Sequence, residues 1–320
     1  MQPHVTRRNF LASTTTVGST AALGATTMLS ASTAAESRSK NFPRWRYCLN
    51  SGTISGHKLT IEEQVQLAAT AGYDGIEPWV RDIETFVEQG GKLSDLKKQI
   101  ADAGLRVEGA IGFAHWIVND PHQRQSGLEQ ARQDMDLIRE IGGMRIAAPP
   151  AGATGDEPLD LLEAAQRYRK LLEIGANIGV VPQLEIWGFS THLSQLGEVS
   201  QVAIDAGHPD ACLLLDIYHL YKGGSSFASL HLLAGQAMHC FHVNDYPADP
   251  PREIIGDKDR IYPGDGIAPL DEIFQTLATG GFTGALSLEL FNRQYWQQPA
   301  ESVARKGLQK MKSAVAHALE

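Results

Sequence analysis

Four ionisable residues stand in or directly after apolar runs in the second half of this 320-residue chain. They are Glu185, Asp216, His242 and Glu289, and successive members are 31, 26 and 47 residues apart. A carboxylate flanked by aliphatic residues is costly to bury unless it is paired or bound to a metal. Three carboxylates and an imidazole, if brought together, form a mostly oxygen-donor site for one divalent metal ion, suited to Mn²⁺, Mg²⁺ or Co²⁺ and also able to take Zn²⁺.

The elements that would position these residues alternate regularly along the chain. The strand-like runs are Tyr47–Asn50, Gly75–Pro78, Arg106–Ile111, Arg145–Ala148, Val181–Ile186, Cys212–Asp216, Cys240–Asn244 and Ala285–Leu290. The stretches with helical spacing between and after them include Ile61–Ala71, Leu93–Ala103, Leu128–Ile141, Leu159–Ile178, Leu270–Leu277 and Val303–Leu319. Strict alternation of strand and helix predicts a parallel sheet with helices outside it.

Eight such units of about 35 residues each match the size of a (β/α)₈ barrel. A doubly wound open sheet is the main rival, but the segment Ser51–Gly56 after the first strand lacks the glycine spacing of a dinucleotide or phosphate loop. We therefore predict an α/β fold that consists of a single (β/α)₈ TIM barrel over residues 46–320. The carboxyl ends of barrel strands meet at one end, which would bring the four ionisable residues together.

The pattern Glu185, Asp216-x-x-His219, His242 and Glu289 resembles the metal site of the xylose-isomerase-like TIM-barrel superfamily. Within it, the chain is most similar to the sugar phosphate isomerase/epimerase group, which includes ketose 3-epimerases, inosose isomerases and dehydratases, and hydroxypyruvate isomerase-like proteins. The resemblance implies that Glu185, Asp216, His242 and Glu289 bind one divalent metal ion. It also implies that Glu185 and Glu289 transfer protons on opposite faces of a bound sugar.

The resemblance further implies that His219 hydrogen-bonds a substrate oxygen. Ketose 3-epimerases carry an arginine a few residues after the histidine of the seventh strand, whereas here the first arginine comes ten residues after His242. Arg252 and Arg260 are the two candidates for that substrate-binding role. This offset weakens a ketohexose-epimerase assignment.

Other residues near the predicted strand ends are suited to holding a sugar. Trp79, Trp116 and Trp187 follow predicted strands, and their flat rings could pack against the C–H faces of a pyranose. His115 and Glu77 lie at similar heights and could bind hydroxyl groups. We expect Trp187, His115 and Glu77 to contact substrate.

Composition limits the partners of the protein. Hydrophobic residues are 42% and charged residues 20%, which is typical of a globular protein. The formal net charge of −9 makes a nucleic-acid partner unfavourable. Three widely spaced cysteines, Cys48, Cys212 and Cys240, exclude a disulfide framework, and we read them as buried packing residues. We expect a small sugar or keto-polyol as the partner, expect no membrane span after residue 35, and leave open whether the chain forms a homo-oligomer.

The first 35 residues have the layout of an export signal. Arg7 and Arg8 are their only Lys or Arg residues, and a mild Ala/Thr/Gly-rich stretch and small residues follow them. This layout is typical of a twin-arginine signal peptide. We predict a cleavable signal over residues 1–35, a linker over 36–45 and a periplasmic location. Removal of the signal would take the formal charge from −9 to −11.

Four functions are compatible with such a barrel, and the first is the expected one: a metal-dependent isomerase or epimerase that acts on a sugar or keto-polyol through an enediolate. The second is a lyase or dehydratase on a keto-sugar with the same metal site, as in inosose dehydratase or in cleavage of a 3-keto-glycoside. The third, a DNA-repair endonuclease, is disfavoured by the net charge and by the few histidines at strand ends. The fourth is a non-catalytic sugar-binding barrel.

Overall fold

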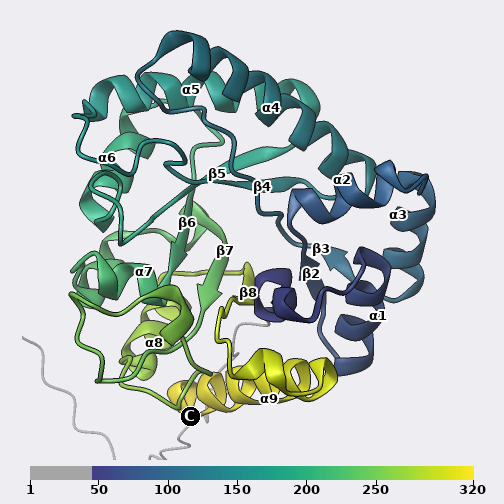
Figure 1. The fold of residues 1–320 in the computed structure, drawn as a ribbon. Helices are drawn as coiled ribbons and strands as arrows, with labels where there is room; N and C mark the ends of the chain where they lie inside the picture. Colours follow the sequence, from purple (N-terminus) through teal and green to yellow (C-terminus); the bar gives the residue numbers. More distant parts are fainter. Residues whose placement is uncertain (1–44) are drawn as a thin grey trace, which may run out of the picture. The chain divides into compact units, whose positions relative to one another are not determined.

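Eight parallel strands form the centre of residues 45–320, the part of the chain that this computed structural model describes (Figure 1). They are β1 (Arg46–Asn50), β2 (Gly75–Glu77), β3 (Arg106–Val107), β4 (Arg145–Ala148), β5 (Val181–Glu185), β6 (Leu213–Asp216), β7 (Met238–Val243) and β8 (Ala285–Leu288). Their order is β3-β2-β1-β8-β7-β6-β5-β4. The Ala147 N–H donates to the Ala110 carbonyl at 2.8 Å, which links β4 to the segment after β3. The predicted TIM-barrel fold is confirmed.

Helices surround this sheet on its outer side (Figure 1). They are α1 (Ile61–Ala71), α2 (Val80–Glu88), α3 (Leu93–Asp102), α4 (Pro121–Glu140), α5 (Leu161–Ile178), α6 (Leu196–Asp205), α7 (Ile217–Lys222), α8 (Leu270–Thr279) and α9 (Ala300–Leu319). Short 3₁₀ turns cover Ser51–His57, Phe227–Leu232, Gly235–Ala237, Asp257–Asp259 and Tyr295–Gln297. The sequence did not predict α2, α6 and α7, since α2 and α6 begin without a Ser, Thr, Asp or Asn cap and α7 has only six residues.

The third strand differs most from its predicted bounds. The sequence pattern predicts a strand over Arg106–Ile111, but the ladder of β3 ends at Val107. The backbone still runs beside β2, because the N–H of Ile111 donates to the Pro78 carbonyl at 3.0 Å. A Cβ atom at position 109 would lie 2.4 Å from Glu77 Oε1. Glycine at this position therefore allows the segment to pass close to that carboxylate.

Alternation along the strands separates two apolar layers. Leu213 and Leu215 of β6 pack in the large core between sheet and helices, whereas Leu214 belongs to a second cluster. The members of that second cluster are Cys48, Ile111, Ala147, Leu214, Cys240 and Ala285. All three cysteines are buried and reduced, as expected for packing residues. Asp216 has the parity of Leu214, so the same alternation that fills the barrel interior aims its carboxylate inward.

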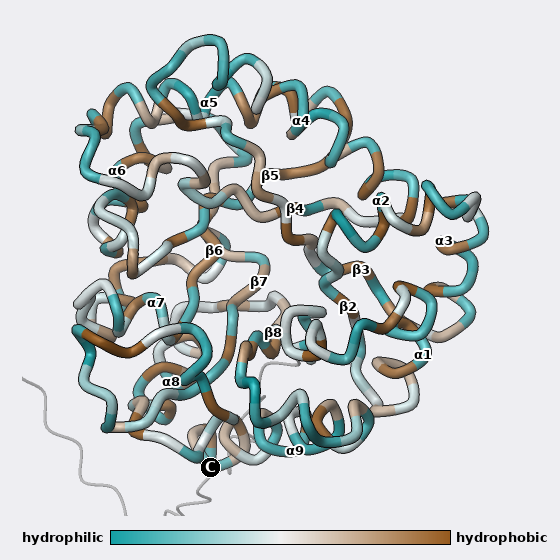
Figure 2. The backbone as a smooth tube through the Cα atoms, viewed as in Figure 1, coloured by the Kyte–Doolittle hydropathy of each residue, from teal (hydrophilic) through white to brown (hydrophobic). Residues whose placement is uncertain are grey.

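The tube in Figure 2 shows hydrophobic segments on the strands and hydrophilic ones on many outer turns of the helices. Trp45 lies in the expected linker, but its side chain is buried and its Nε1 donates to the Phe282 carbonyl at 2.8 Å, so this residue is part of the packed region. The predicted signal over residues 1–35 lies outside the described residues.

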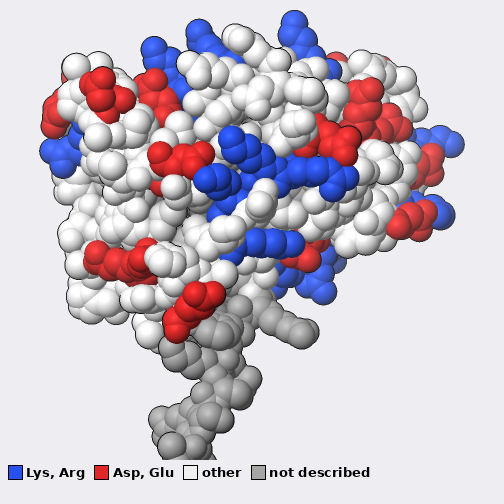
Figure 3. Space-filling model, turned by 90° about the horizontal axis from the view of Figure 1, so that it is seen from below, with Lys and Arg blue, Asp and Glu red and all other residues white. Residues whose placement is uncertain are grey.

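Charges of both signs are distributed over the face shown in Figure 3, with a band of Lys and Arg side chains across its middle. Among residues 45–320, no helix has the length and apolar character that a bilayer crossing requires.

We predict that Tyr168→Phe destabilises the barrel. The buried Tyr168 hydroxyl on α5 donates to the Pro182 carbonyl at 2.8 Å and lies within 3.3 Å of the Cys212 N–H, so it joins β5 and β6. Its loss leaves buried backbone groups unpaired, and we expect the free energy of unfolding to fall by about 1–3 kcal/mol in denaturant titrations. Tyr221→Phe, at a ring that stacks on Tyr246, is the matched control and is expected to be neutral. Equal effects would contradict this account.

Candidate active site

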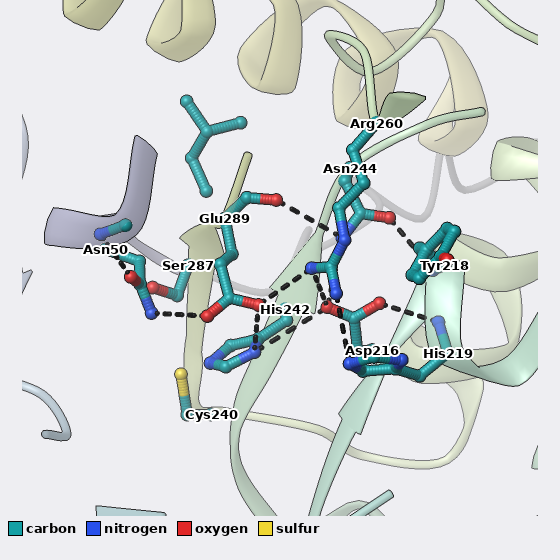
Figure 4. Close-up of polar contacts among 12 residues, drawn as sticks. Asn50, Asp216, Tyr218, His219, Cys240, His242, Asn244, Arg260, Ser287 and Glu289 are labelled. Carbon is teal, nitrogen blue, oxygen red and sulfur yellow. Dashed lines mark hydrogen bonds and ion pairs between the residues drawn. The ribbon is translucent and has the colours of Figure 1, made fainter. Parts of the chain in front are cut away.

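Three of the four predicted ligands converge at the carboxyl ends of neighbouring strands (Figure 4). Asp216 ends β6, His242 lies in β7, and Glu289 directly follows β8. Each residue has one possible metal-ligand atom, and these three atoms lie within 4.8 Å of one another. All three residues are buried. Asp216 also caps α7, because its Oδ1 accepts a hydrogen bond from the N–H of His219 at 2.9 Å. The functional role expected for Asp216 and its structural role as a helix cap are therefore compatible.

A guanidinium group lies among these carboxylates. Nη1 of Arg260 donates to Asp216 Oδ2 at 2.9 Å and to Glu289 Oε2 at 2.8 Å. Nη2 donates to Asp257 Oδ1 at 2.6 Å and lies 3.0 Å from His219 Nε2. The Arg260 side chain is only 1% exposed, so these contacts are made out of water, where charge compensation counts most.

A backbone pairing fixes the segment that carries Arg260. Asp245, just after β7, exchanges two backbone hydrogen bonds of 2.9 Å with Ile261. The Asp245 carboxylate also accepts hydrogen bonds from the N–H groups of Gly264, Gly266 and Ala268. The segment from Pro263 to Ala268 is thus a turn held by one buried carboxylate, and the pairing with Ile261 places the adjacent Arg260 over the site.

Arg252, the other candidate, does not reach the site. Its Nη2 lies 3.5 Å from Glu253, and its side chain is about half exposed. Of the two arginines that the sequence offered, only Arg260 contacts the predicted ligands.

Glu77 lies behind His242 and not on the wall of a pocket. It is completely buried, and its Oε2 lies 3.0 Å from His242 Nε2. The same oxygen accepts hydrogen bonds from Ser287 at 2.7 Å and Asn50 at 2.9 Å. The sequence placed Glu77 among the substrate contacts, but this position lets it orient the imidazole instead, as acceptors behind metal-bound histidines commonly do.

The other imidazole nitrogen of His242 faces the carboxylates. Nδ1 lies 3.2 Å from Glu289 Oε2 and 3.7 Å from Asp216 Oδ2. Burial would lower the pKa of His242, but the charges of Glu289 and Glu77 outweigh it and raise that pKa well above the usual range. In turn, burial would raise the pKa of Glu289, but His242 and Arg260 lower it. The carboxylates of Asp216, Glu289 and Glu77 thus face two cationic groups, the imidazole of His242 and the nearby guanidinium.

Glu185, the fourth predicted ligand, ends β5 and is buried, but it is not part of the close group formed by Asp216, His242 and Glu289. Its Oε2 has no hydrogen-bond partner, and neither has Nδ1 of His242. Burial raises the pKa of Glu185, and the nearby charges of Glu289 and Asp216 raise it further. Glu185 Oε2 has no partner and His242 Nδ1 faces only carboxylate oxygens, and this arrangement fits a site that accepts a divalent cation.

A cavity of about 220 Å³ opens above these residues. Glu185, Glu289, His219 and Arg260 line its polar side. Burial and the neighbouring Arg260 lower the pKa of His219 to about 3, so its imidazole is neutral. Gly188 N–H lies 3.2 Å from His219 Nδ1, which holds the ring against the cavity.

Aromatic residues line the rest of the cavity, and Trp79 and Trp187 are among them. Trp116 is not, because its ring is buried and its Nε1 donates to the Pro149 carbonyl at 2.9 Å. His115 is also outside the lining and lies beside Gly152. Neither can contact a ligand in this cavity as placed here.

Several site residues escaped the sequence analysis. They are Asn50, Phe113, Phe189, Asn244, Asp257 and Phe291. Phe189 and Phe291 stand two positions after Trp187 and Glu289. Since side chains two residues apart in a strand face the same side, this spacing would have indicated both phenylalanines. Asp257 lies in a connecting loop, where no periodic signal exists.

The chain belongs to the family described as Xylose isomerase-like TIM barrel, whose model matches residues 65–314. The resemblance inferred from the sequence is therefore confirmed.

Among characterised relatives, an inosose isomerase of Bacillus velezensis is 23% identical over 265 residues, which cover 81% of this chain and 93% of the relative. A 3-dehydroshikimate dehydratase of Pseudomonas putida is also 23% identical, but the match covers 79% of this chain and only 39% of that protein. A crystal structure of IOLI protein with a binding zinc atom superimposes with a TM-score of 0.79 at 21% identity, covering 85% of this chain and 99% of the other.

We predict that Arg260→Met destabilises the protein in the presence of a chelator and that divalent metal restores it. The substitution leaves Asp216 and Glu289 buried without their cation, which costs about 3–5 kcal/mol. Added Mn²⁺ or Zn²⁺ should raise the melting temperature of the variant more than that of the wild type.

Arg252→Met provides the matched control on the surface. Equal loss of stability in both variants, or no greater response to metal in Arg260→Met, would contradict the assigned contacts.

Proposed function

We propose that this protein is a divalent-metal-dependent isomerase or epimerase of a sugar or keto-polyol. The observation that carries this proposal is that Glu185 and Glu289 both line one cavity together with His219 and Arg260. Two carboxylates at one cavity provide a base and an acid for moving a proton between faces or carbons of a substrate. Membership of a family with isomerase and epimerase relatives supports the same class.

Asp216, His242, Glu289 and Glu185 would hold the metal ion. When bound, a divalent ion supplies positive charge that stabilises negative charge developing on substrate oxygens. Which ion the protein uses stays part of the proposal, with Mn²⁺, Mg²⁺ and Co²⁺ favoured by the oxygen donors, and Zn²⁺ supported by the zinc in the structural neighbour.

The protein's own residues would then move the proton. One of the two glutamates removes a proton from the carbon beside the carbonyl, which leaves an enediolate, and the other returns a proton. Arg260 would place its positive charge at the wall of the cavity, since its Nη atoms already donate to protein carboxylates. The neutral His219 can accept from or donate to a hydroxyl group. The surrounding aromatic side chains keep water away from the reacting carbon.

We predict that Glu185→Gln and Glu289→Gln each reduce proton exchange by at least about a hundredfold, since an amide cannot act as acid or base. The assay incubates the metal-loaded protein with a panel of keto-sugars in D₂O and follows deuterium incorporation by mass spectrometry or NMR. Glu272→Gln on the surface of α8 is the control. Retained exchange in either site variant would remove that residue from the proton-transfer role.

A second candidate is a lyase or dehydratase acting on a keto-sugar. It is favoured by the similarity to a 3-dehydroshikimate dehydratase. The first step would be the same proton abstraction, after which the electron pair expels a hydroxide or alkoxide from the next carbon. Arg260 or a protonated glutamate could assist that departure.

The product separates these two candidates. A lyase is expected to give an α,β-unsaturated ketone, visible as a new ultraviolet absorption band and a loss of 18 mass units when water leaves. An isomerase gives a product of unchanged mass. Detection of the unsaturated product without any interconverted sugar would replace the first proposal by the second.

We also propose that the protein is exported to the periplasm by the twin-arginine route, on the basis of Arg7, Arg8 and the stretch that follows them. Replacement of both arginines by lysine should retain the uncleaved chain in the cytoplasm in fractionation experiments. Unchanged export of that variant would show that another route is used.

A further inference from the structure

A second cleft adjoins the catalytic cavity. This outer cleft, of about 230 Å³, shares Trp79, Ile111 and Phe113 with the cavity above the carboxylates. The two spaces therefore meet at two aromatic rings, Trp79 and Phe113, whose centroids lie 5.1 Å apart in an edge-on contact. Phe113 is 42% exposed, and its ring is available to a ligand that passes from one space to the other.

Aromatic rings continue from this junction around the catalytic cavity. Ring centroids lie 6.1 Å apart between Phe113 and Trp187, and 5.1 Å apart between Trp187 and Phe189. On the other side, Trp79 lies 6.1 Å from Phe291. Such an arc surrounds one ring-sized ligand and leaves the outer cleft as the direction in which a larger ligand would extend.

The outer cleft has the side chains of a polar binding site. Arg81, Glu84, Gln130 and Asp134 line it together with the two shared rings. The Arg81 guanidinium packs over the ring of Trp79 at 4.0 Å, which fixes both groups. Flat rings beside several hydrogen-bonding side chains are the surface that a hydroxylated ring needs, since its C–H faces are apolar and its edge is polar.

Asp134 gives the strongest indication. Its side chain on α4 is only 3% exposed, and Gln130 Nε2 donates to its Oδ1 at 2.7 Å. Burial raises the pKa of Asp134 to about 6, and the charge of Glu84 also raises it. A buried carboxylate without a cationic partner is unfavourable for stability, so a ligand hydroxyl that donates to it would relieve part of that cost.

We infer that the substrate is a two-ring molecule: a reacting keto-sugar bound above Glu185 and Glu289, joined to a second sugar ring bound in the outer cleft between Trp79 and Asp134. This inference rests on the proposed function for the reacting ring alone. The second ring takes no part in the chemistry, and its contacts raise affinity for the larger substrate over a free monosaccharide.

The experiment compares D-fructose with four disaccharides that contain a fructose unit and differ in linkage: turanose, maltulose, palatinose and lactulose. Deuterium exchange in D₂O gives kcat/KM for each, with Mn²⁺ or Zn²⁺ present, and isothermal titration calorimetry gives the affinity of each for the same metal-loaded protein. At least one disaccharide is expected to exceed fructose tenfold or more in one of these measures, as one or two added hydrogen bonds would give.

Asp134→Asn and Glu84→Gln should each reduce the ratio of disaccharide to fructose by about threefold to tenfold. Glu88→Gln lies on the same helix as Glu84 but outside the cleft, and it should leave that ratio unchanged. Melting temperatures of all three variants show whether they are folded, and Glu84→Gln at a half-buried position keeps the test valid if Asp134→Asn fails to fold.

The outcomes separate the two proposals. Exchange that is as fast with fructose as with every disaccharide, with no effect of either cleft variant, overturns the two-ring inference and leaves the isomerase proposal standing. Disaccharide binding that the cleft variants weaken, without exchange on any sugar, supports the outer cleft and contradicts the proposed chemistry. Neither binding nor exchange with any of the five sugars overturns both.

Discussion

The burial of several negative charges at one end of the barrel is the constraint on which the rest of this site depends. Asp216, Glu289 and Glu77 are all removed from water within the reach of one imidazole. Carboxylates in such a place persist only with cations or donors beside them. His242 and Arg260 supply the positive charge within the described residues. Glu185 Oε2 and His242 Nδ1 have no hydrogen-bond partner, so the compensation is incomplete at these two atoms, and a metal ion fits best there.

Along the strands β7 and β8, residues that pack the barrel interior are followed by residues that build the site. In β7, Cys240 fills the lower interior while His242, two residues further on, faces the site. In β8, Ala285 packs in the same inner cluster, Ser287 donates to Glu77, and Glu289 reaches the cavity. In these two strands, residues that pack the barrel interior thus lie beneath residues that build the site, so a small residue and a cysteine lie beneath a charged layer.

The fold and the convergence of three of the four candidate ligands were predictable because both depend on periodic signals. Alternation placed Asp216, His242 and Glu289 on inward faces, and their approach to one another follows from barrel closure. The role of Glu77 was not predictable, since a residue on the inner face can support a neighbour or contact a ligand, and only the distance to His242 distinguishes these cases. Likewise, sequence spacing could not choose between Arg252 and Arg260, because the loop that carries them has no period.

That loop is held at its base in a way that would allow its length to change without moving Arg260. The two backbone hydrogen bonds between Asp245 and Ile261 close the excursion at its base, and the Asp245 carboxylate secures the turn beyond it. Once a loop is clamped in this way, each doubling of its length costs only about 0.6 kcal/mol in closure entropy. Insertions between Asp245 and Ile261 are therefore tolerated, because the Arg260 guanidinium keeps its position. For this reason, the number of residues between His242 and an arginine does not indicate which arginine reaches the site, whereas the backbone pairing at the base of the loop does.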